Sequence, residues 1–560
     1  MSKTKSQPAL QDIGATIQDA LALHRQGRLD EAEKIYRRVL KASPGQFDAL
    51  HLYGMLKLQR GKAGEAYRLI TEALEVDPRS AGALSNLGLV LNALKRGVEA
   101  LASFEKALSL DPDHIEALNN RGRALTELER AEEALGCFDK ALRLDPRQLE
   151  ARINRGNALL DLERFDEAIA DYDAALAIHP AHPGAHFNRG NALAGGARLT
   201  EAIAAYDRSL AVAPTNVKTL NNCGVALAAL NRHQEALDRY GKAVAIDKDY
   251  ADAHFNEALS RLTIGDFRRG FEKYEWRWKR TGMAPPRRNL GRPLWLGEYP
   301  IGRKTILVHA EQGLGDAIQF VRYVKVLARS GAKVVLEAPP ELATLLSRAD
   351  GVAQVVVRGA ALPAFDVHCP LVSLPLALRT EPTSIPADIP YLAAADDRIA
   401  KWRSRLAHLT APRIALAWSG SATHVNDRNR SLALSRLDPV LTAKASFVSV
   451  QRELRDVDRE ALQRNTGLTH VGDELTDFAD TAAVLALVDL VICVDTSVGH
   501  LAGAMGRPTW ILLPFAPDWR WLLGRQDSPW YPTVRLFRQP AVGDWDSLMA
   551  QARSELTRAG

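Results

Sequence analysis

The chain has 560 residues, more than one hydrophobic core normally supports, so two or more folding units are expected. Its 72 Lys and Arg residues against 67 Asp and Glu residues leave a formal charge of +5, which is too small and too mixed to predict a nucleic-acid partner. The N-terminus is polar and no later stretch has about 18 uninterrupted apolar residues, so we expect no transmembrane segment and a cytoplasmic location.

The first half of the chain contains three residue columns that share one spacing. They are the prolines Pro44, Pro78, Pro112, Pro146, Pro180 and Pro214, the glycines Gly54, Gly88, Gly122, Gly156, Gly190 and Gly224, and the alanines Ala32, Ala66, Ala100, Ala134, Ala168, Ala202 and Ala236. A period of about 34 residues is that of the tetratricopeptide repeat, a helical hairpin whose copies stack into a solenoid. The sequence therefore predicts an α-solenoid over residues 11–282, with seven full repeats and a degenerate eighth. The aromatic end of the eighth repeat, Tyr274 to Trp278, is expected to dock on the second domain.

A fourth column consists of asparagines, each two residues before the glycine column: Asn86, Asn120, Asn154, Asn188, Asn222 and Asn256. Carboxamides both donate and accept hydrogen bonds, so a ladder of them suits the backbone of an extended peptide in the concave face of the solenoid. This ladder resembles the one that lines the solenoid of the eukaryotic nucleocytoplasmic O-GlcNAc transferases. The alternative is that asparagine at this position forms only local hydrogen bonds.

Residues 283–302 are rich in Pro and Arg and have no period, so they are predicted to be a linker packed along one edge. From Thr305 onward, short apolar runs alternate with helical patterns, which is typical of parallel sheets covered by helices. The predicted strands are Thr305–His309, Lys333–Leu336, Gln354–Arg358, Arg413–Ala417, Phe447–Val450, Leu490–Val494 and Thr509–Leu513. We expect an α/β module of two Rossmann-like halves, residues 303–400 and 401–560.

Ligands of such sheets bind outside the carboxyl ends of the strands. The loop after the first predicted strand contains Gly313 and Gly315, which let the backbone approach a ligand, and Asp316 at the start of a helix. Asp316 could accept the proton of an attacking hydroxyl group. The alternative is that Asp316 only caps the helix.

Two further loops carry groups suited to an anionic ligand. Arg428 and Arg430 follow the strand Arg413–Ala417, and forked guanidinium donors suit a diphosphate, although a solvated charge run is the alternative. After Leu490–Val494 come Asp495, Thr496, Ser497 and His500, where hydroxyl groups and small residues open a helix whose N-terminus favours an anion. There we expect His500 to hydrogen-bond phosphate or sugar and Asp495 to fix the loop.

Gly315-Asp316, together with the run from Asp495 to Ala502, resembles the signatures of the family 9, heptosyltransferase-like glycosyltransferases. The whole chain is similar to bacterial tetratricopeptide-repeat proteins with such a domain appended, on the stretches 311–316, 426–431, 518–521 and 528–532. The resemblance implies the GT-B fold and a metal-independent, inverting transfer from a nucleotide-activated sugar. It also implies that Asp316 is the base, that Arg430, Thr496, Ser497 and His500 hold the diphosphate, and that Trp519 lines the cleft.

The leading hypothesis is a glycosyltransferase that modifies a polypeptide held by the solenoid. Bacterial members with this layout resemble flagellin-modifying enzymes, which makes flagellin one candidate acceptor. No metal or other cofactor is predicted, since the donor is a substrate and the four scattered cysteines have no metal-ligand spacing. Two alternatives are a transferase acting on a glycan and a scaffold whose transferase fold only binds.

Overall fold

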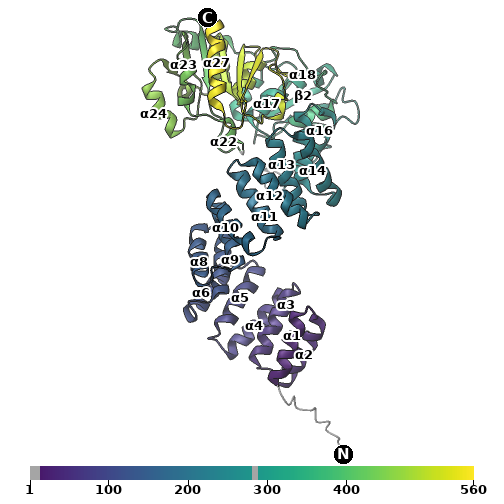
Figure 1. The fold of residues 1–560 in the computed structure, drawn as a ribbon. Helices are drawn as coiled ribbons and strands as arrows, with labels where there is room; N and C mark the ends of the chain where they lie inside the picture. The colour runs from purple at the N-terminus through teal and green to yellow at the C-terminus, as the bar shows by residue number, and fades with distance from the viewer. Residues whose placement is uncertain (1–12, 281–287, 425, 560) are drawn as a thin grey trace, which may run out of the picture. The chain divides into compact units, whose positions relative to one another are not determined.

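The computed structural model describes residues 13–280, 288–424 and 426–559, and its contacts divide the chain into two compact units, 1–214 and 215–560. Unit 1 is all helical (Figure 1). Its helices form consecutive hairpins: α1 Ile13–Arg25 with α2 Leu29–Ala42, α3 Phe47–Gln59 with α4 Ala63–Val76, α5 Ala81–Ala93 with α6 Gly97–Leu110, α7 Ile115–Glu127 with α8 Ala131–Leu144, α9 Leu149–Asp161 with α10 Phe165–Ile178, and α11 Pro183–Gly195 with α12 Leu199–Val212.

The glycine column lies where the two helices of a hairpin approach most closely. A Cβ atom on Gly88 would lie 2.5 Å from the ring of Phe104, and one on Gly156 would lie 2.7 Å from the ring of Tyr172. Each aromatic residue stands 16 positions after its glycine, on the second helix of the hairpin. Any side chain larger than hydrogen would push the helices apart, which explains why glycine recurs at this position.

Unit 2 begins with two further hairpins, α13 Val217–Ala229 with α14 His233–Ile246 and α15 Ala251–Thr263 with α16 Phe267–Tyr274, and the 3-10 turn η1 Glu275–Lys279. The boundary between the two compact units therefore falls inside the repeat array. The physical reason is the eighth repeat, because its aromatic residues Phe267, Phe271 and Tyr274 belong to the same hydrophobic core as the α/β part.

The α/β part of unit 2 contains two parallel sheets. The first has the order β3-β2-β1-β4 and the second the order β10-β9-β8-β5-β6-β7. The strands are β1 Thr305–His309, β2 Lys333–Ala338, β3 Val352–Val357, β4 Val367–Pro370, β5 Arg413–Ala417, β6 Ser446–Ser449, β7 Leu468–His470, β8 Leu490–Val494, β9 Thr509–Leu513 and β10 Val534–Arg538. This confirms the predicted fold class of a repeat solenoid followed by an α/β module.

Helices lie between most successive strands of the α/β part. The helices are α17 Leu314–Phe320, α18 Arg322–Arg329, α19 Pro340–Leu346, α20 Leu374–Ala377, α21 Asp396–Arg405, α22 Asp427–Arg430, α23 Asp438–Leu441, α24 Asp456–Arg464, α25 Phe478–Ala486, α26 Ser497–Ala504 and α27 Trp545–Ala559. The 3-10 turns are η2 Leu371–Ser373, η3 Leu434–Leu437, η4 Gly472–Glu474 and η5 Trp519–Trp521.

All seven predicted strands are present, four of them with the predicted bounds, while β4, β7 and β10 were missed. Each of the three missed strands is an outermost strand of its sheet, where one side of the strand has no partner strand, although the fourth outermost strand, β3, was predicted. β7 has three residues, β4 ends at Pro370, and β10 alternates apolar residues with Arg535 and Arg538. Short or charged edge strands lack the continuous apolar run that marked the central strands.

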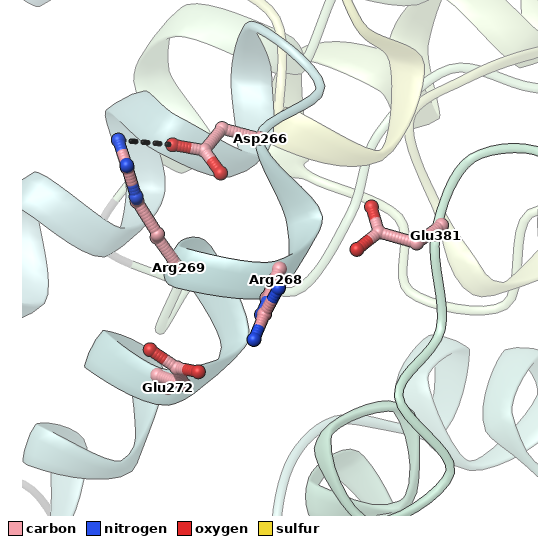
Figure 2. A pocket seen from close by; sticks show the side chains of 5 residues that line it. All are labelled: Asp266, Arg268, Arg269, Glu272 and Glu381. Atoms are coloured by element: carbon pink, nitrogen blue, oxygen red, sulfur yellow. Dashed lines mark ion pairs between the residues drawn. The ribbon is translucent and has the colours of Figure 1, made fainter.

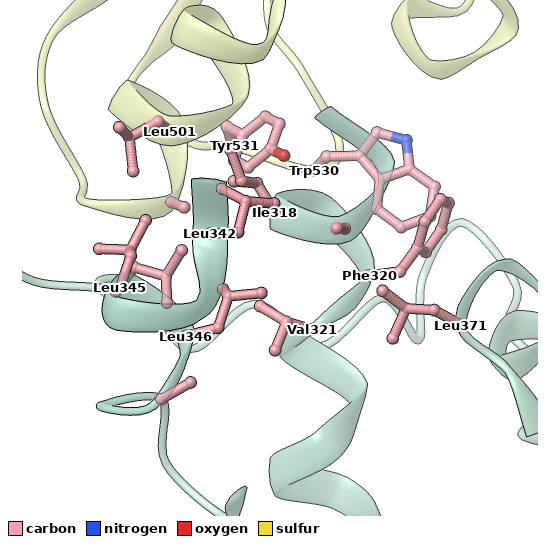
Figure 3. Packing of buried hydrophobic residues seen from close by; sticks show 14 of the residues in the cluster. Ile318, Phe320, Val321, Leu342, Leu345, Leu346, Leu371, Leu501, Trp530 and Tyr531 are labelled. Atoms are coloured by element: carbon pink, nitrogen blue, oxygen red, sulfur yellow. The ribbon is translucent and has the colours of Figure 1, made fainter. Parts of the chain in front are cut away.

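Residues 283–287 of the predicted linker lie outside the described residues, and its residues 293–295 lie beside β4. The backbone N–H of Trp295 donates to the carbonyl of His368 at 2.9 Å, and that of His368 donates to Pro293 at 3.0 Å. One hydrophobic core reaches across both sheets, and in it Phe320 of α17 lies beside Trp530, with Ile318 on the side of α17 toward Leu501 of α26 (Figure 3). The two halves of the α/β part are thus packed directly on each other around α17 and α26.

Candidate functional site

The loops after β1, β5 and β8 meet where α17 packs against α26. Gly315 of α17 makes this approach possible, because a Cβ atom there would lie 2.8 Å from the Cδ2 atom of His500. The loop after β5 reaches the same place through Arg430, whose Nη1 donates to the carbonyl oxygen of Asp495 at 3.0 Å. The structure therefore brings together residues of all three loops that the sequence singled out.

Asp316 is held through both of its carboxylate oxygens. Oδ2 accepts a hydrogen bond from the backbone N–H of Gly313 at 2.9 Å, which caps the N-terminus of α17. Oδ1 forms an ion pair with the guanidinium of Arg520. The capping role weighed in the sequence is thus present, and the carboxylate is also fixed by a cation from the other half of the α/β part.

Arg520 is the main residue of this site that sequence reasoning missed. Its guanidinium also donates to Asp518 Oδ1 and to Gln319 Oε1, both at 2.7 Å. Burial alone would lower the pKa of Arg520, but the carboxylates of Asp518 and Asp316 raise it above its usual range. Arg520 therefore remains a cation and joins α17 to η5.

His500 lies on the first turn of α26 and is 5 % exposed. Its Nδ1 atom is 3.0 Å from the hydroxyl of Tyr531, and its ring stacks on Trp521 with the centroids 5.3 Å apart. Burial, and then the positive charges of Arg520 and Arg322, lower the pKa of His500 well below its usual range. The imidazole is therefore neutral and can both donate and accept a hydrogen bond.

Asp495 and Thr496 are buried just before α26, and Ser497 is half-buried at its first position. Burial, followed by the neighbouring carboxylate of Asp518, raises the pKa of Asp495. Asp495 Oδ1 is 3.9 Å from His500 Nε2, too far for a hydrogen bond. Asp495 contributes to the site through its backbone, since its carbonyl receives Arg430.

The two arginines of the loop after β5 differ in their surroundings. Arg430 is half-buried, and its Nε atom is buried without a hydrogen-bond partner among the described residues. Gly420 leaves room for it, because a Cβ atom at that position would lie 2.5 Å from Arg430 Nη2. Arg428 is exposed, so of the two predicted phosphate-binding arginines only Arg430 is drawn toward α26.

Trp519 is placed differently from the expectation that it lines a cleft. It is 2 % exposed and packs against Phe271, Phe320 and Trp530, with ring centroids 5.7, 6.3 and 6.0 Å away. The turn η5 directs Trp519 into the core and the next side chain, Arg520, toward Asp316. Trp519 therefore holds the last repeat against the α/β part.

The asparagine column forms hydrogen bonds between neighbouring repeats. The Nδ2 atom of Asn154 donates to Asn119 at 3.0 Å, that of Asn188 to Asn157 at 2.8 Å, and that of Asn256 to Asn221 at 2.9 Å. All six asparagines of the column are half-buried: Asn86, Asn120, Asn154, Asn188, Asn222 and Asn256. The amides of Asn154, Asn188 and Asn256 therefore bond to other side chains and not to the local backbone. The column remains partly accessible to solvent.

An open hollow of about 570 Å³ lies elsewhere in unit 2 and is lined by charged side chains (Figure 2). Four of these side chains lie at or on α16, namely Asp266, Arg268, Arg269 and Glu272, and Glu381 lies across from them. The Nη1 atom of Arg269 lies 4.0 Å from the Oδ2 atom of Asp266. None of the predicted site residues lines this hollow.

Within the described ranges, no group of three or more His, Cys, Asp or Glu side chains could hold a metal ion. No described helix combines the length and the apolar character needed to cross a bilayer.

Comparison with known proteins adds to this geometry. Residues 23–87, 79–147 and 153–217 each match a tetratricopeptide-repeat model, and residues 457–512 match the model of glycosyltransferase family 9 (heptosyltransferase). The chain therefore has tetratricopeptide repeats and a region similar to glycosyltransferase family 9. The latter match covers β8 and α26, and so includes Asp495, Thr496, Ser497 and His500 but not Asp316, Arg430 or Arg520.

One curated relative, Protein FlbA of Caulobacter vibrioides, is 28 % identical over 334 residues. The chain spans about half of that relative, since the match covers 55 % of each protein. Among solved structures, YrrB, a TPR protein with an unusual peptide-binding site, is 27 % identical, with 33 % of this chain and 95 % of that chain covered at a TM-score of 0.29. The type IV pilus biogenesis factor PilW is 25 % identical, with 37 % and 96 % covered at a TM-score of 0.35.

Proposed function

We propose that the chain is a metal-independent, inverting glycosyltransferase that moves a sugar from a nucleotide-activated donor to a polypeptide acceptor. The observation that carries this proposal is the approach of Gly315 to His500. It brings the carboxylate on α17 next to the N-terminus of the family 9 helix α26. A potential base and an anion-binding helix end thus lie side by side at the carboxyl ends of parallel strands.

In the proposed reaction, the oxygen of an acceptor hydroxyl attacks the anomeric carbon of the donor sugar and forms the new glycosidic bond. The bond between that carbon and the phosphate oxygen breaks, and its electron pair leaves with the nucleoside diphosphate. Asp316 accepts the proton of the hydroxyl group. Its fixed orientation, with one oxygen on Gly313 N–H and the other on Arg520, suits a base that must act in one direction.

The departing diphosphate needs positive charge. Arg430 offers a half-buried guanidinium beside Asp495, and the N-terminus of α26 offers the partial positive charge of its backbone dipoles. Neutral His500 can hydrogen-bond a phosphate or sugar oxygen, with Tyr531 fixing its ring. In this proposal Thr496 and Ser497 open the same helix and complete the donor side.

The acceptor is proposed to lie along the repeats, where the asparagine column leaves carboxamides partly accessible. A single polypeptide backbone could bond to successive amides regardless of its sequence. Flagellin is one acceptor to test. If the protein transferred sugar to a saccharide but to no polypeptide, the acceptor would be a glycan and the repeats would serve only to localise the enzyme.

The first experiment is calorimetric titration of the full chain with UDP, GDP, ADP, dTDP and CMP. Binding of one nucleotide, weakened about tenfold or more in Arg430→Ala, is the expected result. Arg428→Ala should weaken binding less, because Arg428 is exposed. Arg436→Ala is the matched control, since that arginine pairs with Asp546 on the surface.

A nucleotide that binds then names the sugar donors to test for transfer to protein. Loss of binding in Arg436→Ala as well as in Arg430→Ala would point to a general charge effect. If no nucleotide bound to the folded chain, this would contradict the proposed donor site. It would favour the alternative that the protein is a scaffold without transferase activity.

A further inference from the structure

The segment that ends the repeats contacts the α/β part through charged side chains, of which Arg277 reaches furthest into it. Arg277 in η1 is 3 % exposed, and its Nη2 atom lies 3.0 Å from Glu311 Oε1 and 2.7 Å from Ser373 Oγ. Its Nη1 atom donates to Glu275 Oε1 at 2.6 Å. A guanidinium from the eighth repeat therefore lies among side chains from two loops of the first sheet.

Those two loops follow neighbouring strands. Glu311 lies in the loop between β1 and α17, and its Oε2 atom accepts from the backbone N–H of Leu371, just after β4, at 3.1 Å. Arg277 and Glu311 together tie the carboxyl ends of β1 and β4 to the last repeat. The adjacent residue, Gln312, is also held from the repeat side, by the hydroxyl of Tyr274 at 3.1 Å.

The loop held in this way is the one that carries Asp316. Gly313 follows Gln312 directly and donates its N–H to Asp316 Oδ2. Glu311, Gln312 and Gly313 are thus three consecutive residues, of which two are fixed by the repeats and the third orients the carboxylate. A displacement of Glu311 would reach Asp316 through only five residues of chain.

The contact is also costly to break. Arg277 and Glu311 have side chains that are 2 % and 6 % exposed, and a buried charge left without its partner is strongly destabilising. Burial raises the pKa of Glu311 to about 7, against the opposing effect of Arg277. A surface ion pair would tolerate loss of one partner, whereas this one should force the loop to rearrange.

We propose that Arg277 is a positioning residue for the loop of Asp316, which makes the end of the repeat array a working part of the transfer site. This inference rests on the proposed function, because Asp316 acts as the base there. Arg277 itself touches neither donor nor acceptor in this proposal. It acts through Glu311 and the backbone of residues 311–313.

The test compares Arg277→Met with Arg277→Lys and with the control Arg280→Ala, all in the full chain. Arg280 lies in the same segment but pairs with Asp252 inside the repeat, at 2.6 Å. Amide hydrogen exchange of residues 310–320 should be about tenfold faster in Arg277→Met and unchanged in Arg280→Ala. Arg277→Lys should fall between them, because lysine keeps the charge but not the fork that reaches both loops.

Measuring kcat and the nucleotide Kd separately distinguishes an effect on the position of Asp316 from an effect on donor binding. In Arg277→Met we expect kcat for transfer to fall about tenfold or more, with the nucleotide Kd within about twofold, since the proposed donor side is built on the second sheet. Unchanged exchange in the 310–320 peptide would overturn the proposal, even if kcat fell. Unchanged kcat together with faster exchange would also overturn it.

If Arg277→Met fails to fold, Arg277→Lys replaces it, because lysine keeps the charge but loses the fork that reaches both Glu311 and Ser373. The same two changes, smaller in size, are then expected, and their absence would overturn the proposal. A wild-type chain that binds no nucleotide and transfers no sugar would refute the proposed function. The exchange comparison would then still decide whether Arg277 holds the loop.

Discussion

Gly315 and His500 belong to the two different halves of the α/β part, and a Cβ atom on Gly315 would lie 2.8 Å from His500 Cδ2. The imidazole of His500 cannot move away from α17, because Tyr531 and Trp521 contact it on its other sides. The distance between α17 and α26 is therefore set by the absence of a side chain at residue 315. That distance also fixes how far Asp316 lies from the donor side of the proposed site.

Gly315→Ala should therefore lower the free energy of unfolding of unit 2 by about 1–3 kcal/mol and weaken nucleotide binding. All ten tryptophans lie at or after Trp276, so urea unfolding followed by tryptophan fluorescence reports on unit 2 alone. Gly241→Ala is the control, because a Cβ atom on that residue of α14 would meet nothing within 4 Å. A Gly315→Ala protein as stable as the control, with unchanged nucleotide binding, would show that the close approach is not required.

Arg520→Gln should lower the free energy of unfolding of unit 2 more than Gly315→Ala does. It leaves the half-buried carboxylates of Asp316 and Asp518 without the buried guanidinium that they share, which lowers the free energy of unfolding by up to about 3–5 kcal/mol. Arg520→Lys should recover only part of this, since lysine cannot serve both carboxylates and Gln319 with one fork. The surface pair of Arg525 and Asp527 supplies the control, where Arg525→Gln should change the free energy of unfolding by less than about 1 kcal/mol. Equal effects of the Arg520 and Arg525 substitutions would contradict the role given to the buried pair.

The asparagine column can be tested with a matched pair of variants. Asn154→Ala and Asn119→Ala each break the same hydrogen bond between repeats, but only Asn154→Ala removes a carboxamide of the column. If the column grips a peptide, Asn154→Ala should raise KM for a polypeptide acceptor about threefold or more relative to Asn119→Ala. Equal KM values in the two variants would mean that the column only joins the repeats.

The stability of unit 2 should depend on pH through Glu311. Burial raises the pKa of Glu311 from 4.5 to about 7 in the folded chain, so between these values the folded chain holds a proton that the unfolded chain releases. The contribution of this group to stability therefore increases as pH falls from about 7 toward about 4.5, and its full penalty is present above 7. Glu311→Gln should remove this dependence, seen as a smaller change in the urea midpoint between about pH 5 and about pH 8.

Glu474→Gln is the control with the opposite sign. The hydrogen bond from exposed Arg405 lowers the pKa of Glu474, so its contribution is present above the unfolded pKa and is lost as pH falls. The two variants should thus alter the pH dependence in opposite directions, and a shift in the same direction would contradict the assignment to Glu311.

The period of the glycine column was enough to predict the hairpins, because the same steric requirement recurs in every repeat. The central strands were equally clear, since burial on both faces demands an uninterrupted apolar run. Arg520 could not be found in the same way. Its partner Asp316 lies 204 residues away, and no local pattern indicates which charges meet after such a separation.

In the run from Asp518 to Trp521, Trp519 is buried in the core and Arg520 pairs with Asp316. The expectation that Trp519 lines the cleft came from the resemblance to family 9 and not from a local pattern. The direction of each side chain depends on the turn η5 and on the aromatic residues of α16, which lie about 250 positions earlier. A signal that could have favoured Arg520 is the pair of neighbouring tryptophans, which can bury the stem of an arginine.

The contact between a glycine and the ring 16 positions later is the same in successive hairpins from Gly88 and Phe104 to Gly224 and Tyr240. In the eighth hairpin the corresponding residues are Ala258 and Tyr274, and the tyrosine bonds to Gln312 in the α/β part. Whole hairpins upstream could therefore be duplicated or deleted in evolution without altering any residue near Asp316. The last hairpin is not interchangeable in this sense, so the reach of the repeats and the chemistry of the site are able to evolve separately.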